Sequence, residues 1–122
     1  MKYILILNIL FLSTFAFGKE LSGTINIKKG LKTKGVLFVF AKNYGSKSQM
    51  PVVVKKIENP TFPVQFTLTA KDTMFPNTPF KGEFEVTARL SPSGDVMDKS
   101  GSQVKSLKAI KLGSSDINLT LE

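Results

Sequence analysis

The side chains that most often carry catalysis or hold metals are missing from this 122-residue chain. It contains no histidine, no cysteine and no tryptophan. Serine–histidine catalysis, thiol nucleophiles, zinc centres and axial histidine ligation of haem are therefore excluded. The remaining acid–base candidates are scattered carboxylates, and the pair Glu83 and Glu85 lies on the solvated face of an expected strand. We expect a protein that is not an enzyme and that has no cofactor and no metal centre.

Three methionines are the side chains that could still hold a soft metal. Thioether sulfur binds copper(I), and exported methionine-rich proteins can use it for that purpose. Met50, Met74 and Met97 are far apart in the sequence and form no clustered motif. We expect them to pack in the core or to anchor loops. A periplasmic copper carrier remains an alternative if the fold brings all three together.

The charge is strongly positive, with a formal net charge of +8 for the whole chain. Arg89 is the one arginine, and all the other cations are lysines. Sites for nucleic acid usually use arginine forks as well, so we expect no nucleic-acid partner. Lysines commonly protect sheet edges and keep small domains soluble. A lysine-driven contact with an anionic envelope surface stays open as an alternative.

The N-terminal segment has the pattern of a secretory signal peptide. A short basic start precedes the apolar run 4–17, and Ala16-Phe17-Gly18 resembles a cleavage site. The run is shorter than the roughly 20 residues that span a bilayer, although retention as an anchor is the alternative. We predict a signal peptide at 1–18 and a single domain at 19–122. The mature protein would be periplasmic or secreted in a bacterial cell envelope, with no stable membrane span.

The rest of the chain shows strand patterns and almost no helix signal. Residues 83–90 alternate, with Phe84, Val86, Ala88 and Leu90 on one side. Seven short runs of this kind are separated by turn residues: 21–27, 36–41, 50–57, 63–69, 83–90, 104–112 and 116–121. Without crossover helices, antiparallel pairing is expected. The sequence therefore predicts an all-β fold, an antiparallel β-sandwich of about seven strands.

Three stretches resemble a known family. They are "VLFVFAKNYGSKSQMPVVVKKI" (36–57), "FPVQFTLTAKDTMFP" (62–76) and "FEVTARLSPSGDVMDKSGS" (84–102). In order and spacing they are similar to the C-terminal periplasmic domain of cytochrome c-type biogenesis proteins of the CycH kind. The residues that carry the resemblance are Phe38, Phe40, Ala41, Lys42, Gly45, Met50, Pro51, Lys55, Lys56, Pro63, Leu68, Asp72, Met74, Ala88, Arg89, Ser91 and Gly94.

The resemblance implies an immunoglobulin-like sandwich and a possible accessory role in c-type cytochrome maturation. Proteins of that family carry membrane helices and tetratricopeptide repeats before this domain, whereas here the signal-like segment leads directly into it. We expect a binding module that holds an envelope protein or peptide, such as an apocytochrome or an assembly component, through a strand edge or a loop surface. The candidate partner-binding residues are Lys42, Tyr44, Gly45, Met50, Pro51, Arg89, Ser91 and Gly94. Arg89 has a structural alternative, pairing with Glu83, Glu85 or a carbonyl.

Overall fold

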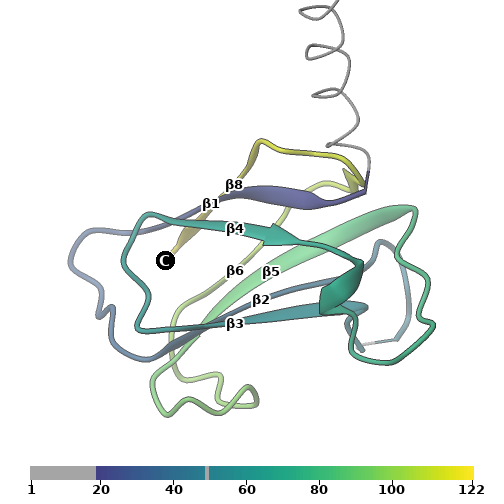
Figure 1. Cartoon of the computed structure of the whole chain (residues 1–122). Coiled ribbons are helices and arrows are strands. Elements are labelled where there is room, and N and C mark those ends of the chain that lie inside the picture. Colours follow the sequence, from purple (N-terminus) through teal and green to yellow (C-terminus); the bar gives the residue numbers. More distant parts are fainter. Residues whose placement is uncertain (1–18, 49) are drawn as a thin grey trace, which may run out of the picture.

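The computed structural model of the chain describes residues 19–48 and 50–122, and in these ranges it contains eight strands and one short 3-10 helix (Figure 1). The strands are β1 (Leu21–Ile27), β2 (Val36–Asn43), β3 (Val53–Glu58), β4 (Val64–Leu68), β5 (Glu83–Ser91), β6 (Gln103–Lys105), β7 (Ile110–Lys111) and β8 (Ile117–Leu121). The helix, η2 (Ala70–Asp72), follows β4 directly. The predicted signal peptide at 1–18 lies outside the described residues. Among those that are described, no helix is long and apolar enough to cross a membrane.

The strands form two sheets that pack face to face. The smaller sheet has the order β4-β1-β8, and the larger one has the order β3-β2-β5-β6, with β7 also pairing with β5. Figure 1 shows the two layers, with β4 and β1 above β3, β2 and β5. The predicted all-β, immunoglobulin-like sandwich is confirmed, and most of its strand pairs are antiparallel.

Alternation along the strands explains the core. In β5 the inward side chains of Phe84, Val86, Ala88 and Leu90 are at most 2% exposed, as the sequence pattern predicts. The central strand β2 contributes three fully buried side chains from its inner face, and β1, β4 and β8 supply the opposite layer. The core members from these strands are Leu21, Ile25, Leu37, Val39, Ala41, Val64, Phe66, Leu68, Ile117, Leu119 and Leu121. Both sheets therefore bury one face against the other.

One strand pair runs in the direction opposite to the expectation. β1 and β8 are parallel, with Gly23 opposite Ile117. The expectation of antiparallel pairing throughout was wrong here because the whole sandwich lies between these strands in sequence, so no hairpin turn fixes their relative direction. The contact is close at Gly23, where a Cβ atom would overlap the carbonyl oxygen of Ile117. Glycine is therefore required at this position for the two strands to approach.

The largest differences from the predicted strand ranges are at the start of the third strand and in the run 104–112. The third strand begins at Val53 instead of residue 50, because Pro51 lacks an N–H and pairing starts only when Val52 donates its N–H to the Ala41 carbonyl at 2.7 Å. The predicted run 104–112 divides into β6 and β7, and the residues between them leave the ladder. This division adds an eighth strand to the seven that were expected.

Candidate functional site

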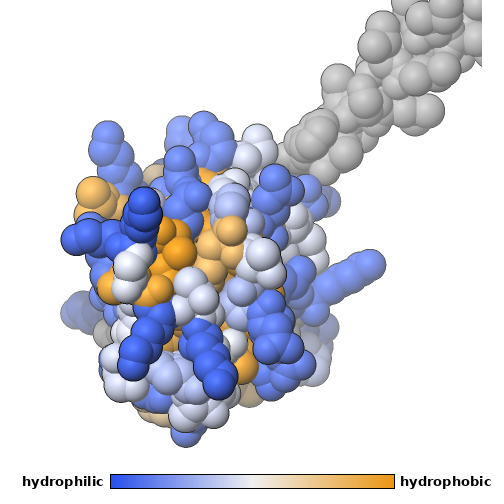
Figure 2. All heavy atoms as spheres, turned by 90° about the vertical axis from the view of Figure 1, so that its left-hand side faces the viewer, coloured by the Kyte–Doolittle hydropathy of each residue, from blue (hydrophilic) through white to orange (hydrophobic). Residues whose placement is uncertain are grey.

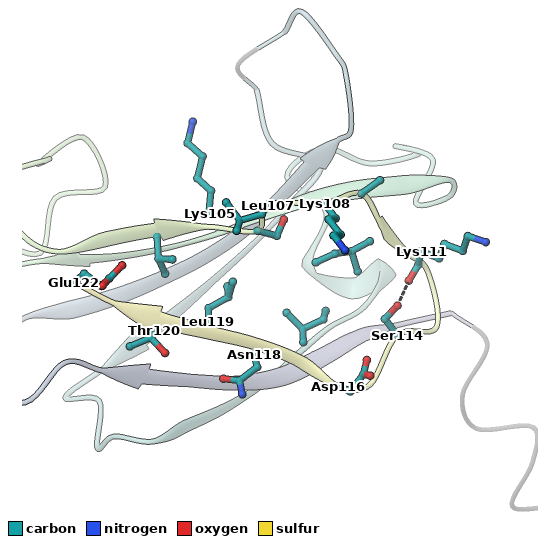
Figure 3. A pocket seen from close by; sticks show the side chains of 15 residues that line it. Lys105, Leu107, Lys108, Lys111, Ser114, Asp116, Asn118, Leu119, Thr120 and Glu122 are labelled. Carbon is teal, nitrogen blue, oxygen red and sulfur yellow. Dashed lines mark hydrogen bonds between the residues drawn. The ribbon is translucent and has the colours of Figure 1, made fainter.

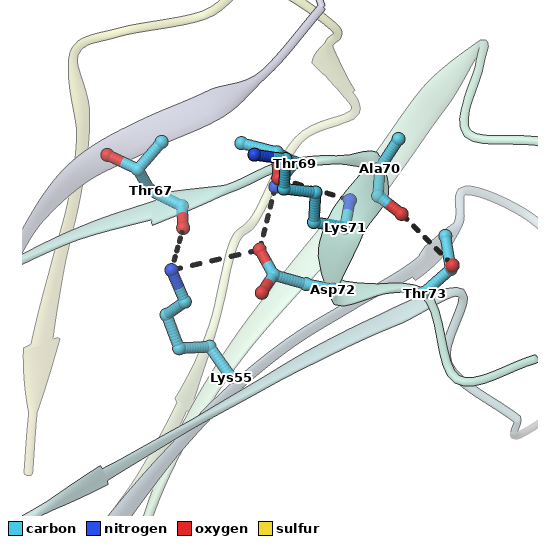
Figure 4. A network of polar contacts seen from close by, with 7 residues as sticks. All are labelled: Lys55, Thr67, Thr69, Ala70, Lys71, Asp72 and Thr73. Atoms are coloured by element: carbon cyan, nitrogen blue, oxygen red, sulfur yellow. Dashed lines mark hydrogen bonds and ion pairs between the residues drawn. The ribbon is translucent and has the colours of Figure 1, made fainter.

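The two lateral sides of the sandwich, where the edges of the two sheets meet, are built differently. On one side the edge strands β3 and β4 are joined by polar contacts (Figure 4). Lys55 of β3 reaches across the gap and donates to the Thr67 carbonyl of β4 at 2.8 Å. Its Nζ also lies 3.8 Å from the carboxylate of Asp72. We call this the closed side, since one long side chain links the two sheets there.

The helix η2 completes the closed side. Its cap is reciprocal: the N–H of Lys71 donates to the Thr69 hydroxyl at 3.2 Å, and the N–H of Thr69 donates to the Asp72 carboxylate at 2.9 Å. This capping box satisfies backbone donors at the first turn and fixes the carboxylate beside Lys55. The chain therefore supplies a partner for one outward group of β4, the Thr67 carbonyl, and places η2 directly after the strand.

The opposite side, which we call the open side, has no such link between its sheets in the part of the chain that the structure describes. There β8 is the edge strand of its sheet and pairs only with β1. The N–H of Lys28 donates to the Leu121 carbonyl at 2.8 Å, so the backbone groups of Leu121 point toward β1. Because backbone groups alternate along a strand, those of Asn118 and Thr120 point away, toward the free edge. This edge offers unpaired donors and acceptors.

A shallow groove of about 690 Å³ runs between β8 and the β6–β7 segment (Figure 3). Its apolar lining comes from both sheets: Val104, Leu107, Ala109, Ile110, Ile117 and Leu119. The side chain of Leu107 is 95% exposed, the most exposed large hydrophobic side chain among the described residues. In Figure 3 Leu119 lies between the two segments, whereas Asn118 and Thr120 point to the outer face of β8. The groove therefore places apolar surface directly beside an unpaired strand edge.

Charged side chains flank this groove. Lys105, Lys108 and Lys111 come from the β6–β7 segment, and Asp116 and Glu122 stand before and after β8. Seen from the end of the sandwich at which β8 finishes, hydrophobic surface is visible among projecting hydrophilic side chains (Figure 2). Lysines beside a strand edge discourage pairing with another copy of the same basic chain.

The structure divides the predicted partner-binding residues between two ends of the larger sheet. Lys42, Tyr44, Gly45, Met50 and Pro51 lie together around the β2–β3 connection, at the end where β5 begins. Asn43, the last residue of β2, pairs with Phe84 at this end. The opposite end is marked by Val36, the first residue of β2, which pairs with Ser91. The eight predicted residues therefore do not form one continuous surface.

The other three predicted residues, Arg89, Ser91 and Gly94, are engaged within the protein. Arg89 donates from Nε to the Gln103 side chain at 2.8 Å and from Nη1 to the Val96 carbonyl at 2.7 Å. Its guanidinium also lies 5.1 Å from the centre of the Phe40 ring. These contacts include the carbonyl pairing that was the structural alternative for Arg89, and they hold the β5–β6 connection against the outer face of the larger sheet.

Ser91 and Gly94 shape the same connection. The buried hydroxyl of Ser91 donates to the Asp95 carbonyl at 2.7 Å and accepts from the N–H of Gly94 at 3.0 Å. Gly94 has φ of 86°, a conformation that favours glycine. Hydrogen bonds from Ser100 and then from Ser93 hold the pKa of Asp98 in this connection well below its usual range. The residues thus fix a turn.

The three methionines do not converge. Met74 donates its N–H to the Val52 carbonyl at 3.2 Å, so it lies at the same end of β3 as Met50. Met97 belongs to the β5–β6 connection, at the opposite end of β2, and is 72% exposed. The condition for a three-methionine copper site is therefore not met. No group of three or more acidic side chains that could hold a metal occurs among the described residues either.

The open side was missed by sequence reasoning. One signal was available, because the run 104–112 has an irregular hydrophobic pattern, with Ser106-Leu107-Lys108 interrupting the alternation. The pattern could not show that β8 returns to pair with β1, since that partner lies at the other end of the domain. The unpaired edge and its groove follow from that long-range pairing.

The comparisons with known proteins agree with this architecture. No curated protein and no solved structure matches the chain. A family model does match, over residues 21–122, and its description is the Ig-like domain of cytochrome c-type biogenesis protein H. The match covers every strand of both sheets. The chain therefore belongs to the family of Ig-like domains of cytochrome c-type biogenesis protein H.

Proposed function

We propose that this protein is a non-enzymatic binding module of the bacterial cell envelope that takes part in c-type cytochrome biogenesis. Its partner is an extended segment of an apocytochrome or of an assembly component. Membership of the family supports the biogenesis role. The observation that carries the binding mode is the free edge of β8 beside an apolar groove.

Strand addition explains how such a surface would bind. A segment laid along β8 would satisfy the outward backbone groups of Asn118 and Thr120, and main-chain hydrogen bonds of this kind supply affinity without demanding a particular sequence. Alternate side chains of the segment would face the groove, where Val104 and Ile110 line the opposite wall. The groove would therefore select segments with an apolar residue at every second position.

Binding at this edge needs no catalytic group and no cofactor. The outward donors and acceptors belong to the backbone, and the lining is apolar. A protein without histidine or cysteine can perform this task as well as any other. The side chains named for partner binding at the β2–β3 connection, Lys42 to Pro51, lie elsewhere and are not required for this mode.

A proline scan of the two sheet edges tests the proposal. Thr120→Pro removes the outward N–H from β8, while the hydrogen bonds from β8 to β1 stay intact. Gln65→Pro is the matched control, because the Thr67 carbonyl accepts from Lys55 on the outer edge of β4, so the N–H of Gln65 also points outward. Each tagged protein is produced from the full chain and used to recover partners from an envelope extract. We expect the control and the unmodified protein to recover an apocytochrome or an assembly component, and Thr120→Pro to lose it.

Two outcomes would contradict the proposal. Equal recovery by Thr120→Pro would exclude strand addition to β8, provided that its thermal unfolding matches that of Gln65→Pro. Recovery of no apocytochrome and no assembly component by the unmodified protein would exclude the cytochrome role. Leu107→Asp tests the groove without altering the strand edge, since it leaves the β8 backbone unchanged and places a charge in the apolar lining. We expect this variant to recover less of the partner than the unmodified protein does.

A further inference from the structure

A second surface lies at the end of the sandwich where β2 ends and β5 begins. Four large apolar side chains are exposed there: Tyr44 at 50%, Met50 at 54%, Met74 at 45% and Phe75 at 54%. They come from two connections, β2–β3 (residues 44–52) and β4–β5 (residues 69–82). We call this set the loop-end patch. It forms no part of the groove at β8 and has no role in strand addition.

Backbone contacts hold the two connections together. The N–H of Met74 donates to the Val52 carbonyl at 3.2 Å, and Thr73 forms an isolated bridge with Val53. The N–H of Tyr44 donates to the Glu83 carbonyl at 2.9 Å. Figure 1 shows both connections at the right-hand end of the molecule. The exposed side chains are therefore presented by a structured surface.

Basic side chains accompany the patch. Lys47, Lys71 and Lys81 are exposed on the same two connections. The one carboxylate there, Asp72, lies 3.8 Å from Lys55 on the closed side. Glu83 and Glu85 lie at the same end of β5, opposite Lys111 and Lys42 in the strand register, and Glu20 and Asp116 precede β1 and β8 there. The excess of lysine therefore belongs to the two connections themselves. Apolar side chains flanked by exposed lysines match the interface of an anionic bilayer, where rings and thioethers enter the acyl boundary and ammonium groups meet lipid phosphates.

The place at which the chain enters the domain also favours a membrane as the partner of the loop-end patch. Leu21, the first residue of β1, pairs with Leu68, the last residue of β4, so β1 begins at the end that carries the loop-end patch. The sequence before it, residues 4–17, is almost continuously apolar. A segment of that composition associates with a membrane during export or afterwards. The loop-end patch therefore lies at the end of the domain where β1 begins, which is where the chain enters from the apolar run.

We infer that the loop-end patch docks on the surface of an anionic phospholipid membrane. Docking at this end leaves the edge of β8 along the side of the domain, where it stays accessible to a protein partner. The inference stands independently of the proposed strand addition, because the two surfaces share no residue.

Site-directed fluorescence tests the inference directly. The chain contains no cysteine, so one introduced cysteine is a unique site for a polarity-sensitive dye. Pro76→Cys places the dye beside Phe75, and Thr61→Cys places it on the exposed β3–β4 connection at the other end of the larger sheet. The predicted mature chain, residues 19–122, contains every core residue of the sandwich. It is mixed with vesicles of phosphatidylglycerol and phosphatidylcholine, and with phosphatidylcholine alone. We expect a blue shift at position 76 on the anionic vesicles, and no shift at position 61 on either vesicle.

Substitutions then identify the contributing side chains. Met74→Ser with Phe75→Ser should raise the lipid concentration at half-maximal signal roughly tenfold, since each side chain loses part of its apolar contact. Lys47→Glu with Lys71→Glu should also weaken binding by tenfold or more, because each lysine near an anionic surface contributes about a fivefold factor. The matched control is Leu107→Ser, which removes an exposed apolar side chain from the groove and should leave the signal unchanged.

Several results would overturn the inference. The inference would be wrong if the emission of the dye at position 76 did not change on anionic vesicles, or if position 61 showed an equal shift. It would also be wrong if the double variant of Met74 and Phe75 bound the vesicles as well as the unmodified protein does. A shift that requires an added envelope protein and not lipid would assign the loop-end patch to a protein partner instead. Loss of partner recovery by Thr120→Pro without any change in vesicle binding would support the separation of the two surfaces.

Discussion

The closed and open sides of the sandwich differ in how far the chain supplies partners for the outward backbone groups of their edge strands. Each ends in an edge strand whose outward backbone groups need partners. On the closed side Lys55 donates to one of these groups, the Thr67 carbonyl, and the capped helix η2 follows directly after β4. On the open side no such link joins β8 to the β6–β7 segment among the described residues, and a groove of about 690 Å³ is lined by both. The difference is that one side chain links the two sheets on the closed side, whereas no described side chain does so on the open side.

The most damaging change should be at the contact that holds β8 in place. Gly23→Val would drive a branched side chain into the Ile117 carbonyl, so we expect a loss of roughly 3 kcal/mol or more in the free energy of unfolding. Thr24→Val, one residue along β1 on its outward face, should change stability little. Urea denaturation of both variants measures the effect. A mild effect of Gly23→Val would mean that β8 is held loosely.

Truncation of one leucine on each side compares how well the two sides are packed. Leu68 on β4 is fully buried, whereas Leu119 on β8 borders the groove. Leu68→Ala should cost about 3–4 kcal/mol, because it leaves an enclosed cavity. Leu119→Ala should cost about 2 kcal/mol, since solvent in the groove can reach the vacated space. Equal losses in chemical denaturation would show that the open side is as tightly packed as the closed one.

Removal of the link on the closed side should have a smaller effect. Lys55→Met keeps the aliphatic stem but deletes the donor to the Thr67 carbonyl, and we expect a loss of about 1 kcal/mol. Lys56→Met is the matched control, because its partner Glu58 is exposed and such pairs contribute little. Thermal and urea unfolding should show a larger loss of stability for Lys55→Met than for Lys56→Met. A neutral Lys55→Met would indicate that η2 alone closes this side.

The smallest effect concerns the connection that leads into the open side. Ser100 and Ser93 hold the pKa of Asp98 below the value of about 3.9 that an unfolded chain has. A lowered pKa stabilises the folded state above the unfolded pKa, and this contribution is lost as the pH falls toward the folded one. Asp98→Asn should therefore be slightly less stable than the unmodified protein near neutral pH, and the gap should narrow below about pH 4. Urea unfolding across this range checks the trend, and a gap that widens in acid would contradict it.

Local patterns predicted most of the fold. Alternation in residues 83–90 gave the inward residues of β5 correctly, and the strand-like runs located β1, β2, β4 and β8. The start of β3 was placed too early because Pro51 was assigned to the strand, although a residue without an N–H cannot donate to the ladder. The predicted loop residues at 42–51 do lie together, but Arg89 is occupied by Gln103 and the Val96 carbonyl. Such contacts depend on how a connection folds back, which strand periodicity does not encode.

The sequence by itself determined the chemistry and the layers of this protein. The absence of histidine and cysteine removes whole classes of sites, and residues alternating in and out require two sheets that share one core. Only the tertiary structure decided which edges stay open. β8 pairs in parallel with β1, although nearly the whole domain separates the two strands in sequence. That pairing places the free edge of β8 opposite the β6–β7 segment. Strand pairing between distant segments is set by the packing of the whole core, so no local stretch of sequence could reveal the groove.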